Sequence, residues 1–205
     1  MKVLYSHYLT QSNHPAVQMV EHISRELRTF GHDVRIHASA GLENAIEIPP
    51  PSPSSDDASE PGSLASQSVQ FKRFLKRNLW FAKAMYRNRG RYAHDLRALR
   101  EFQPDIVLAR QDAYCWSVVK ASRKLNIPVV TYADAPVAYE VRMFNDAQRW
   151  HPPGLVEYIE RWGIKRSRSV ITVSHPAASR LQRYRVKCPI YVDHNGIDEL
   201  SLIHI

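Results

Sequence analysis

The segment SVITVSHPAASRL at Ser169–Leu181 decides the fold, because it is typical of a buried strand that ends in serine and passes directly into a helix. A short apolar run, PIYV, follows at 189–192, and the chain then reaches NGID at 195–198. A strand, a helix and a second strand in this order indicate a βαβ unit with parallel strands and a right-handed crossover. The rest of the chain shows the same alternation.

The first forty residues predict another βαβ unit. KVLYS at 2–6 is a short apolar strand, a helix is expected to start near Pro15, and DVRIHA at 33–38 is a second strand. Gly31 is suited to end the helix, since glycine adopts the left-handed backbone of a C-cap without strain. The expected buried face repeats every three or four residues: Ala16, Val20, Ile23, Leu27 and Phe30.

Further strands are predicted at 105–109, 128–132 and 169–173, with helices at 113–125 and 154–167 between them. A long connection through Pro152 and Pro153 precedes the second of these helices. About six short strands, several of them continuous in apolar residues, alternate with helices in this way. This pattern favours an α/β fold, a Rossmann-like open parallel sheet with helices on both faces.

Composition narrows the class of protein without choosing a function. The chain has 205 residues, enough for one domain, and 28 basic against 20 acidic residues give a net charge of +8, which favours anionic partners. No apolar run approaches the ~20 residues that cross a bilayer, and the N-terminus has no signal-peptide pattern, so we expect a cytoplasmic protein. Cys115 and Cys188 lack metal-ligand spacing and are expected to be buried thiols.

Two segments interrupt the alternation. Residues 41–68 are rich in proline and serine, and we expect a mobile, exposed loop there. Residues 69–102 are predicted to be helical and basic, with eight cations and no acidic residue between Phe71 and Arg91. Such a helix could lie on an anionic membrane surface or bind nucleic acid. The alternative is a helix that packs its apolar face on the sheet and leaves its basic face in water.

Ligands of open α/β sheets bind beyond the carboxyl ends of the strands, and polar residues follow four of the predicted strands. For each of them the alternative is an ordinary solvated loop position. The candidate substrate-binding residues are Ser12, Asn13, His14, Arg110, Asp134, Ala135, Pro136, Glu140 and Ser174.

Other site classes lack their signatures. The chain contains no G-x-G-x-x-G fingerprint, no phosphate-binding P-loop and no G-x-S-x-G elbow, which argues against dehydrogenases, P-loop NTPases and α/β-hydrolases. His32 and His37 could face a metal, but lone histidines at helix ends and in strands are usually structural. We therefore expect no metal and no cofactor.

Four motifs in order resemble the N-terminal domain of the GT-B glycosyltransferases of family 4. PDIVLARQDAYCWS (104–117) is similar to the segment in which Pro-Asp opens a strand, and IPVVTYADAPVAYE (127–140) to a V-N-A-P-L-A-Y-E loop. VEYIERWGIKRSRSVITVS (156–174) resembles the family's glutamate-bearing helix and its valine-serine strand end. HNGID (194–198) resembles P-N-G-[IV]-D, which leads to the linker between domains.

The resemblance implies transfer of a sugar from a nucleotide-sugar donor to a sugar or lipid-linked acceptor, with retention at the anomeric carbon and without a metal ion. Polysaccharide or glycolipid biosynthesis is the expected setting. Residues 9–14 would lie near the donor phosphates, Asp134 is the best candidate for a catalytic residue, and Asn195 and Gly196 would begin the hinge. The sequence departs from the family where relatives carry glycines in the first loop, since SNHPA stands there, and His194 replaces the proline of P-N-G.

The resemblance also implies a C-terminal donor-binding domain, which the 205 residues do not include. We expect that residues 1–198 form the N-terminal domain and that 199–205 are not native, because LSLIHI at 200–205 resembles a translated sequencing adapter. On this interpretation the chain alone does not catalyse transfer. Two alternatives stay open: one half of a nucleotide-sugar epimerase of the same architecture, or a basic module that binds nucleic acid or membrane.

Overall fold

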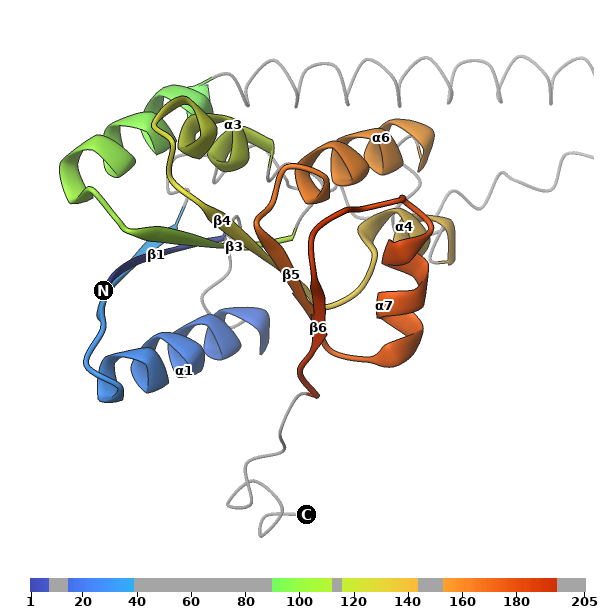
Figure 1. Ribbon diagram of the computed structural model, residues 1–205, viewed down its shortest axis with the longest axis horizontal. Coiled ribbons are helices and arrows are strands. Elements are labelled where there is room, and N and C mark those ends of the chain that lie inside the picture. Colours follow the sequence, from blue (N-terminus) through green and yellow to red (C-terminus); the bar gives the residue numbers. More distant parts are fainter. Residues whose placement is uncertain (8–14, 39–89, 112–115, 144–152, 195–205) are drawn as a thin grey trace, which may run out of the picture.

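The computed structural model describes residues 1–7, 15–38, 90–111, 116–143 and 153–194. Six parallel strands form one sheet in the order β2-β1-β3-β4-β5-β6 (Figure 1), which confirms the expected Rossmann-like α/β fold. The strands are β1 (Lys2–His7), β2 (Asp33–Ala38), β3 (Ile106–Arg110), β4 (Val129–Ala133), β5 (Ser169–Thr172) and β6 (Ile190–Val192).

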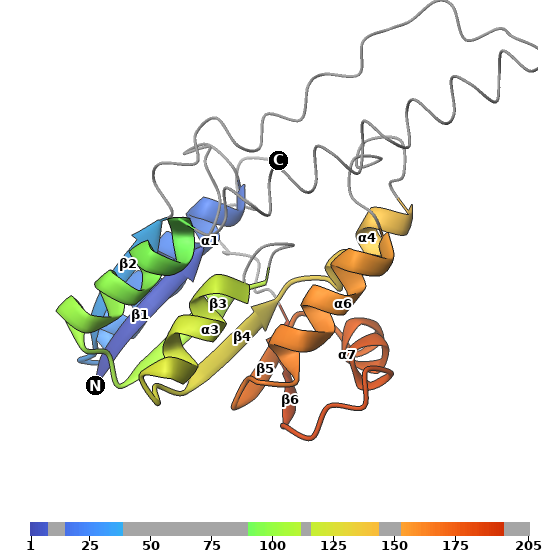
Figure 2. The ribbon, with the colours of Figure 1, turned by 90° about the horizontal axis from the view of Figure 1, so that it is seen from above.

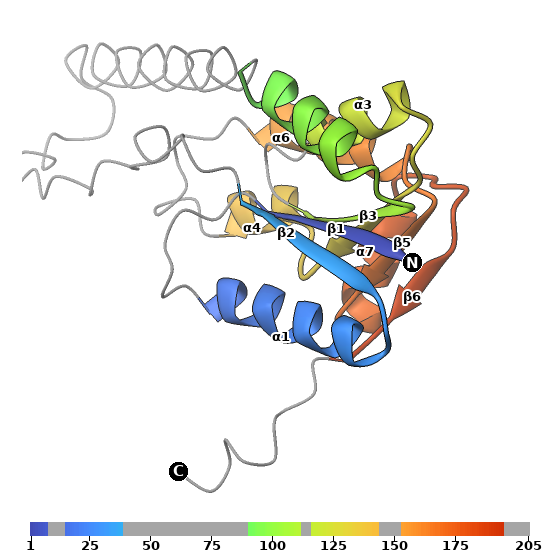
Figure 3. The same ribbon diagram turned by 90° about the vertical axis from the view of Figure 1, so that its left-hand side faces the viewer.

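Helices cover both faces of this sheet. Helix α1 (Pro15–Thr29) lies on one face, and the helix at 90–102, α3 (Trp116–Lys124) and α6 (Pro153–Ile164) lie on the other (Figure 3). Helix α7 (His175–Gln182) packs beside β5 and β6. None of the helices in the described ranges is both long and apolar enough to span a membrane.

Successive side chains along each strand point to opposite faces of the sheet, so the core consists of two layers. Val3 and Tyr5 of β1 face α1, where they pack with Val20. Leu4, between them in sequence, points to the opposite layer. Because both faces are covered, every residue of β1 after Lys2 is buried, which explains why several of the predicted strands are continuously apolar rather than alternating.

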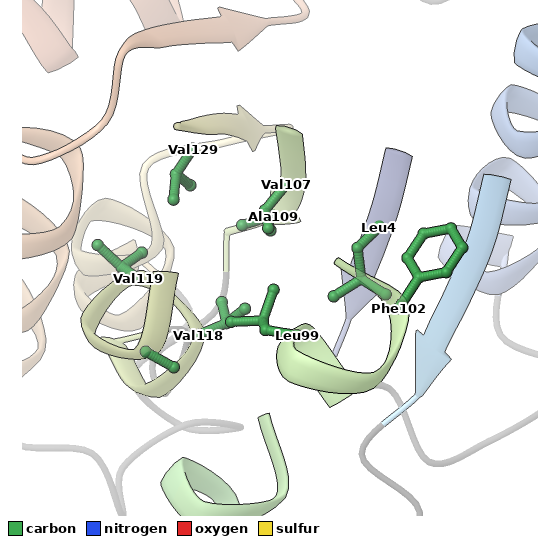
Figure 4. Close-up of a cluster of buried hydrophobic side chains, with 9 residues drawn as sticks. Leu4, Leu99, Phe102, Val107, Ala109, Val118, Val119 and Val129 are labelled. Atoms are coloured by element: carbon green, nitrogen blue, oxygen red, sulfur yellow. The ribbon is translucent and has the colours of Figure 1, made fainter. Parts of the chain in front are cut away.

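The layer opposite α1 is the larger cluster (Figure 4). It joins three strands to the helix at 90–102 and to α3. Its buried members are Leu4, Leu99, Phe102, Val107, Ala109, Val118, Val119, Ala121 and Val129. The prediction of helix up to Phe102 is confirmed for the described residues 90–102, and the last turn of this helix supplies two of these side chains.

The C-terminus of α1 differs from the expectation at one residue. Gly31 has φ of 80°, and its N–H donates to the Arg28 carbonyl while His32 N–H donates to Leu27, the hydrogen bonds of a Schellman motif. The helix therefore ends at Thr29, and the chain turns before Phe30 can join the apolar face. Phe30 is 76% exposed, so its assignment to the core was wrong.

A second difference is α4 (Val137–Met143), a short helix in the region interpreted from sequence as a long connection. Cys188 is only partly buried and is a free thiol. Arg91, counted among the cations of the basic segment, is buried with 4% of its surface exposed. The expectations for the loop at 41–68, for the basic segment before residue 90, for Cys115 and for the tail at 199–205 lie outside the described residues.

Candidate functional site

The strand order creates a switch point at the carboxyl edge of the sheet. Strands β1 and β3 are neighbours, but the connection after β1 leads through α1 to β2 on one side, whereas the connection after β3 leads through α3 to β4 on the other. Diverging connections leave a crevice where open α/β sheets bind ligands. The described part of this edge includes His7 at the end of β1 and Arg110 at the end of β3.

Arg110 and Asp134 form an ion pair at this edge. Arg110 is opposite Tyr132 in the β3–β4 ladder, and Asp134 lies two residues beyond that partner. Arg110 Nη2 donates to Asp134 Oδ2, and the two side chains are only 15% and 27% exposed. The Nε of Arg110 is buried with no hydrogen-bond partner among the described residues. Two of the predicted site residues, 24 positions apart, are thus brought into contact.

Glu140 of α4 belongs to the same electrostatic cluster. Burial raises the pKa of its carboxyl, the Asp134 carboxylate raises it further, and Arg110 partly opposes the rise. Burial and the same Asp134 carboxylate raise the pKa of Tyr132 to about 12. The pKa of Tyr5 on β1 is also raised, mainly by burial and next by the Asp134 carboxylate. This edge of the sheet therefore carries one guanidinium, two carboxyl groups and two phenols. The two phenols stay protonated at neutral pH.

Helix α6 lies beside α4 (Figure 2), and its Glu160 holds the start of α4, directly after Asp134, Ala135 and Pro136. Its side chain is fully buried, and its two carboxyl oxygens accept from the backbone N–H groups of Val137 at 2.7 Å and Ala138 at 3.3 Å. These are first-turn amides of α4, which have no carbonyl partner within the helix.

The Tyr184 hydroxyl donates to Glu160 Oε2 at 2.6 Å and completes this network. Burial raises the pKa of the Glu160 carboxyl, against the three hydrogen bonds that favour its charged form. Burial and the adjacent Glu160 also raise the pKa of the Tyr184 phenol. A carboxyl group buried behind the turn thus holds in place the residues that begin α4.

Glu160 was not predicted from the sequence as a residue of this region. A signal was present, because Val156, Glu160 and Ile164 repeat every four residues and share one face of α6. All three are buried, so the pattern placed a carboxylate in an apolar stripe. A buried carboxylate requires donors, and here a backbone segment 23 residues away supplies them.

Ser174 has a structural role in the described structure. It is the N-cap of α7, with extended backbone angles, and its side chain accepts from Ala177 N–H at 3.3 Å. It lies past the carboxyl end of β5. The remaining predicted site residues, Ser12, Asn13, His14, Asn195 and Gly196, lie outside the described residues.

Comparison with known families matches the family model "Glycosyltransferase Family 4" to residues 16–199. The fold and the motif order agree with this match, which covers most of the chain. The chain belongs to glycosyltransferase family 4. No curated protein matches the chain.

Solved structures with the same fold include a UDP-GlcNAc 2-epimerase from Neisseria meningitidis bound to UDP-GlcNAc, at 17% identity and a TM-score of 0.53, which covers 94% of this chain and 45% of that one. The UDP-GlcNAc 2-epimerase from Methanocaldococcus jannaschii is similar at 16% identity, TM-score 0.51, with 94% and 45% covered. UGT2 of Phytolacca americana, complexed with UDP-2fluoro-glucose and pterostilbene, is similar at 12% identity, TM-score 0.51, with 99% and 56% covered. The chain spans about half the length of these proteins.

Proposed function

We propose that this chain forms the acceptor-side wall of a retaining glycosyltransferase that uses a nucleotide-sugar donor. The observation that carries the proposal is the family match over residues 16–199. It is supported by the pairing of Arg110 with Asp134 at the switch point of the sheet. Solved proteins of the same fold are complexed with UDP-GlcNAc in one case and with a UDP-sugar analogue in another, which supports a nucleotide sugar as the donor class.

In this proposal the residues of the pair have separate roles. Asp134 faces the reacting sugar and orients or deprotonates the acceptor hydroxyl, which makes it the best candidate for a catalytic residue. Arg110 holds the Asp134 carboxylate and offers its buried Nε to an anionic group, such as a donor phosphate. Glu140, Ala135 and Pro136 line the same wall, and Ser12, Asn13 and His14 approach the donor phosphates. Neither metal nor cofactor takes part.

Transfer requires a second wall that binds the donor, since proximity and exclusion of water need both sides of a cleft. We therefore propose that residues 1–205 alone are inactive, that Asn195 and Gly196 begin a hinge, and that a donor-binding domain completes the enzyme. The acceptor is a sugar or lipid-linked sugar of polysaccharide or glycolipid assembly, reached at the cytoplasmic face of a membrane. In this proposal the cations of residues 71–91, except the buried Arg91, contact anionic lipid.

The test uses the protein encoded by the gene together with its downstream coding sequence. It is incubated with a panel of nucleotide sugars and a lipid-linked acceptor, and product is followed by mass spectrometry, with the anomeric configuration read by NMR. Asp134→Asn should abolish transfer. Asp33→Asn, an exposed aspartate at the amino end of β2, should not. Transfer that survives Asp134→Asn unchanged would remove Asp134 from the mechanism.

One alternative is favoured by a specific observation, because two of the similar structures are UDP-GlcNAc 2-epimerases. An epimerase converts the nucleotide sugar itself and needs no acceptor. The same incubation without acceptor separates the two functions: an epimerised nucleotide sugar supports the epimerase, whereas an unchanged donor that is consumed only with acceptor supports the transferase.

A further inference from the structure

A second polar cluster lies at the edge strand β2, apart from the Arg110–Asp134 pair. It contains His37 on β2 and the neighbouring residues His94 and Asp95 on the helix at 90–102. Strand β1 separates β2 from β3, and both β1 and β3 separate β2 from β4, so the strand of His37 is about 10 Å from that of Arg110 and about 14 Å from the strand that leads to Asp134. The clusters also lie on opposite faces, because His37 meets the helix at 90–102, whereas Arg110, two residues after Leu108 in β3, points to the same α1 side as Leu108.

Hydrogen bonds hold His37 and Asp95 of this cluster in place. His37 Nε2 and Asp95 Oδ1 are 2.8 Å apart, and Asp95 is fully buried while His37 is 7% exposed. Ser117 of α3, also fully buried, donates its hydroxyl to Asp95 Oδ2 at 2.6 Å. One carboxylate oxygen is therefore committed to a serine that fixes its direction, and the other is turned toward the imidazole.

His94 brings a second imidazole to the same place. Its ring stacks on that of His37 with centroids 4.9 Å apart and planes inclined by 21°. One potential ligand atom from each of His37, His94 and Asp95 lies within 4.8 Å of the others. His94 is exposed, so the cluster opens to solvent on one side. A buried His–Asp pair does not require a second histidine stacked on it.

We propose that His37, His94 and Asp95 bind a divalent transition-metal ion, with Zn²⁺ as the reference ion. Two imidazole nitrogens and one carboxylate oxygen suit zinc and its neighbours in the first row better than magnesium or calcium, which prefer all-oxygen shells. Zinc sites with three protein ligands of this kind leave a fourth position for water. The exposed side of the cluster, where His94 lies, provides that position.

The geometry requires a small rearrangement. Ligand atoms about 2.1 Å from a tetrahedral metal are about 3.4 Å from one another, so the cluster must contract from its present separation. His37 Nε2 and Asp95 Oδ1, now 2.8 Å apart, have to separate by about 0.6 Å so that the ion can replace the hydrogen between them. The exposed His94 ring has to turn toward them. Ser117 then acts as the outer hydrogen-bond partner that ligating carboxylates usually have.

The test titrates the metal-stripped chain with Zn²⁺ alone, using calorimetry and competition with a chromophoric chelator, and repeats the titration with Co²⁺ to record its visible spectrum. We expect one ion per chain. Ser117→Ala should weaken binding by about 10- to 100-fold, as loss of an outer partner does elsewhere, and His94→Ala should weaken it at least as much. His94 is exposed, so its replacement leaves the fold intact, and an unchanged melting temperature without metal verifies this.

The matched control is His175→Ala. His175 and His194 form another pair of adjacent imidazoles, with centroids 5.6 Å apart, and both are exposed. The proposed site predicts that this variant binds Zn²⁺ like the parent chain. Absence of stoichiometric binding, affinity that is unchanged in His94→Ala, or affinity that is lost in His175→Ala would each overturn the proposal. Because the readout is metal binding and not sugar transfer, its outcome is independent of the proposed function.

Discussion

Two replacements of Glu160, by alanine and by glutamine, should distinguish how much its hydrogen bonds and how much its charge contribute to the stability of the fold. Glu160→Ala removes the acceptor for three donors: Val137 N–H, Ala138 N–H and the Tyr184 hydroxyl. Each buried donor without a partner costs about 1–3 kcal/mol. Water that enters the new cavity can satisfy part of this loss, so we expect the free energy of unfolding to fall by about 3–5 kcal/mol rather than by the full sum.

Glu160→Gln should be far milder. The amide oxygen can keep the hydrogen bond from Val137 N–H, and its NH₂, in the place of Oε2, can donate to the Tyr184 hydroxyl, which then acts as an acceptor; only the longer bond from Ala138 N–H is lost. We expect a loss of about 1 kcal/mol or less at neutral pH. The matched control is Glu157→Ala, one turn earlier on α6. Glu157 pairs with Arg142 at the surface, with side chains 34% and 55% exposed, so its removal should cost less than about 1 kcal/mol.

The pH dependence carries a definite sign. The pKa of Glu160 is raised in the folded chain, so in the interval between its unfolded and folded values the folded state binds more protons. Stability from this group is therefore full below the unfolded value and is lost as pH rises through the folded one. Glu160→Gln cannot ionise, so its stability relative to the parent chain should improve as pH increases over that interval.

Urea unfolding followed by far-UV circular dichroism, repeated at several pH values, measures all three variants. If Glu160→Ala and Glu157→Ala lose equal stability, the buried acceptor does not hold α4 as described. If the difference between Glu160→Gln and the parent chain does not change with pH, the raised pKa is wrong.

Three further outcomes follow from other contacts. Ser174→Ala removes the N-cap of α7 and should lower the free energy of unfolding by about 1 kcal/mol in urea titrations, whereas Ser174→Asp should restore most of it; equal stability of the two variants would contradict the cap. Asp134→Asn removes an anion that raises the pKa of Glu140, so the Glu140 carboxyl should titrate at lower pH in NMR of side-chain-labelled glutamate. An unchanged pKa of Glu140 would show that the two groups are too far apart to interact. Burial raises the pKa of the Cys188 thiol, so in a Cys115→Ser background this thiol should react with iodoacetamide at neutral pH more slowly than a model thiol does. A rate equal to that of the model thiol would contradict the raised pKa.

The strands could be predicted from the sequence because their signal is local. In a parallel sheet covered on both faces the central strands are short apolar runs. The edge strand β2, DVRIHA, was also predicted with its observed bounds. Strands β3 and β4 begin and end one residue later than predicted. The apolar pattern gives a strand's existence, whereas its ends depend on which backbone groups the neighbouring strand can pair.

Helix α4 could not be predicted for the opposite reason. Its seven residues are too few to form a stable helix by themselves, and its first turn depends on Glu160. Phe30 failed in a similar way, since the position at which Gly31 turns the chain decides whether that ring joins the helix face. In both cases a residue that is not part of the local apolar pattern, Glu160 for α4 and Gly31 for Phe30, decides the structure.

The candidate site was predicted as a set of strand ends, but the pairing within it required the register. Ending β3 at Ala109 would have left Arg110 in a loop with no fixed direction. In the structure Arg110 is the last residue of β3, opposite Tyr132, so the pleat directs its side chain to the α1 face of the sheet. Asp134 has the same parity on the neighbouring strand path, two residues past Tyr132, and is turned to the same face. One residue of strand extension therefore converts two polar loop residues into a part-buried ion pair, and a shift of the β3–β4 register by one residue would separate them again.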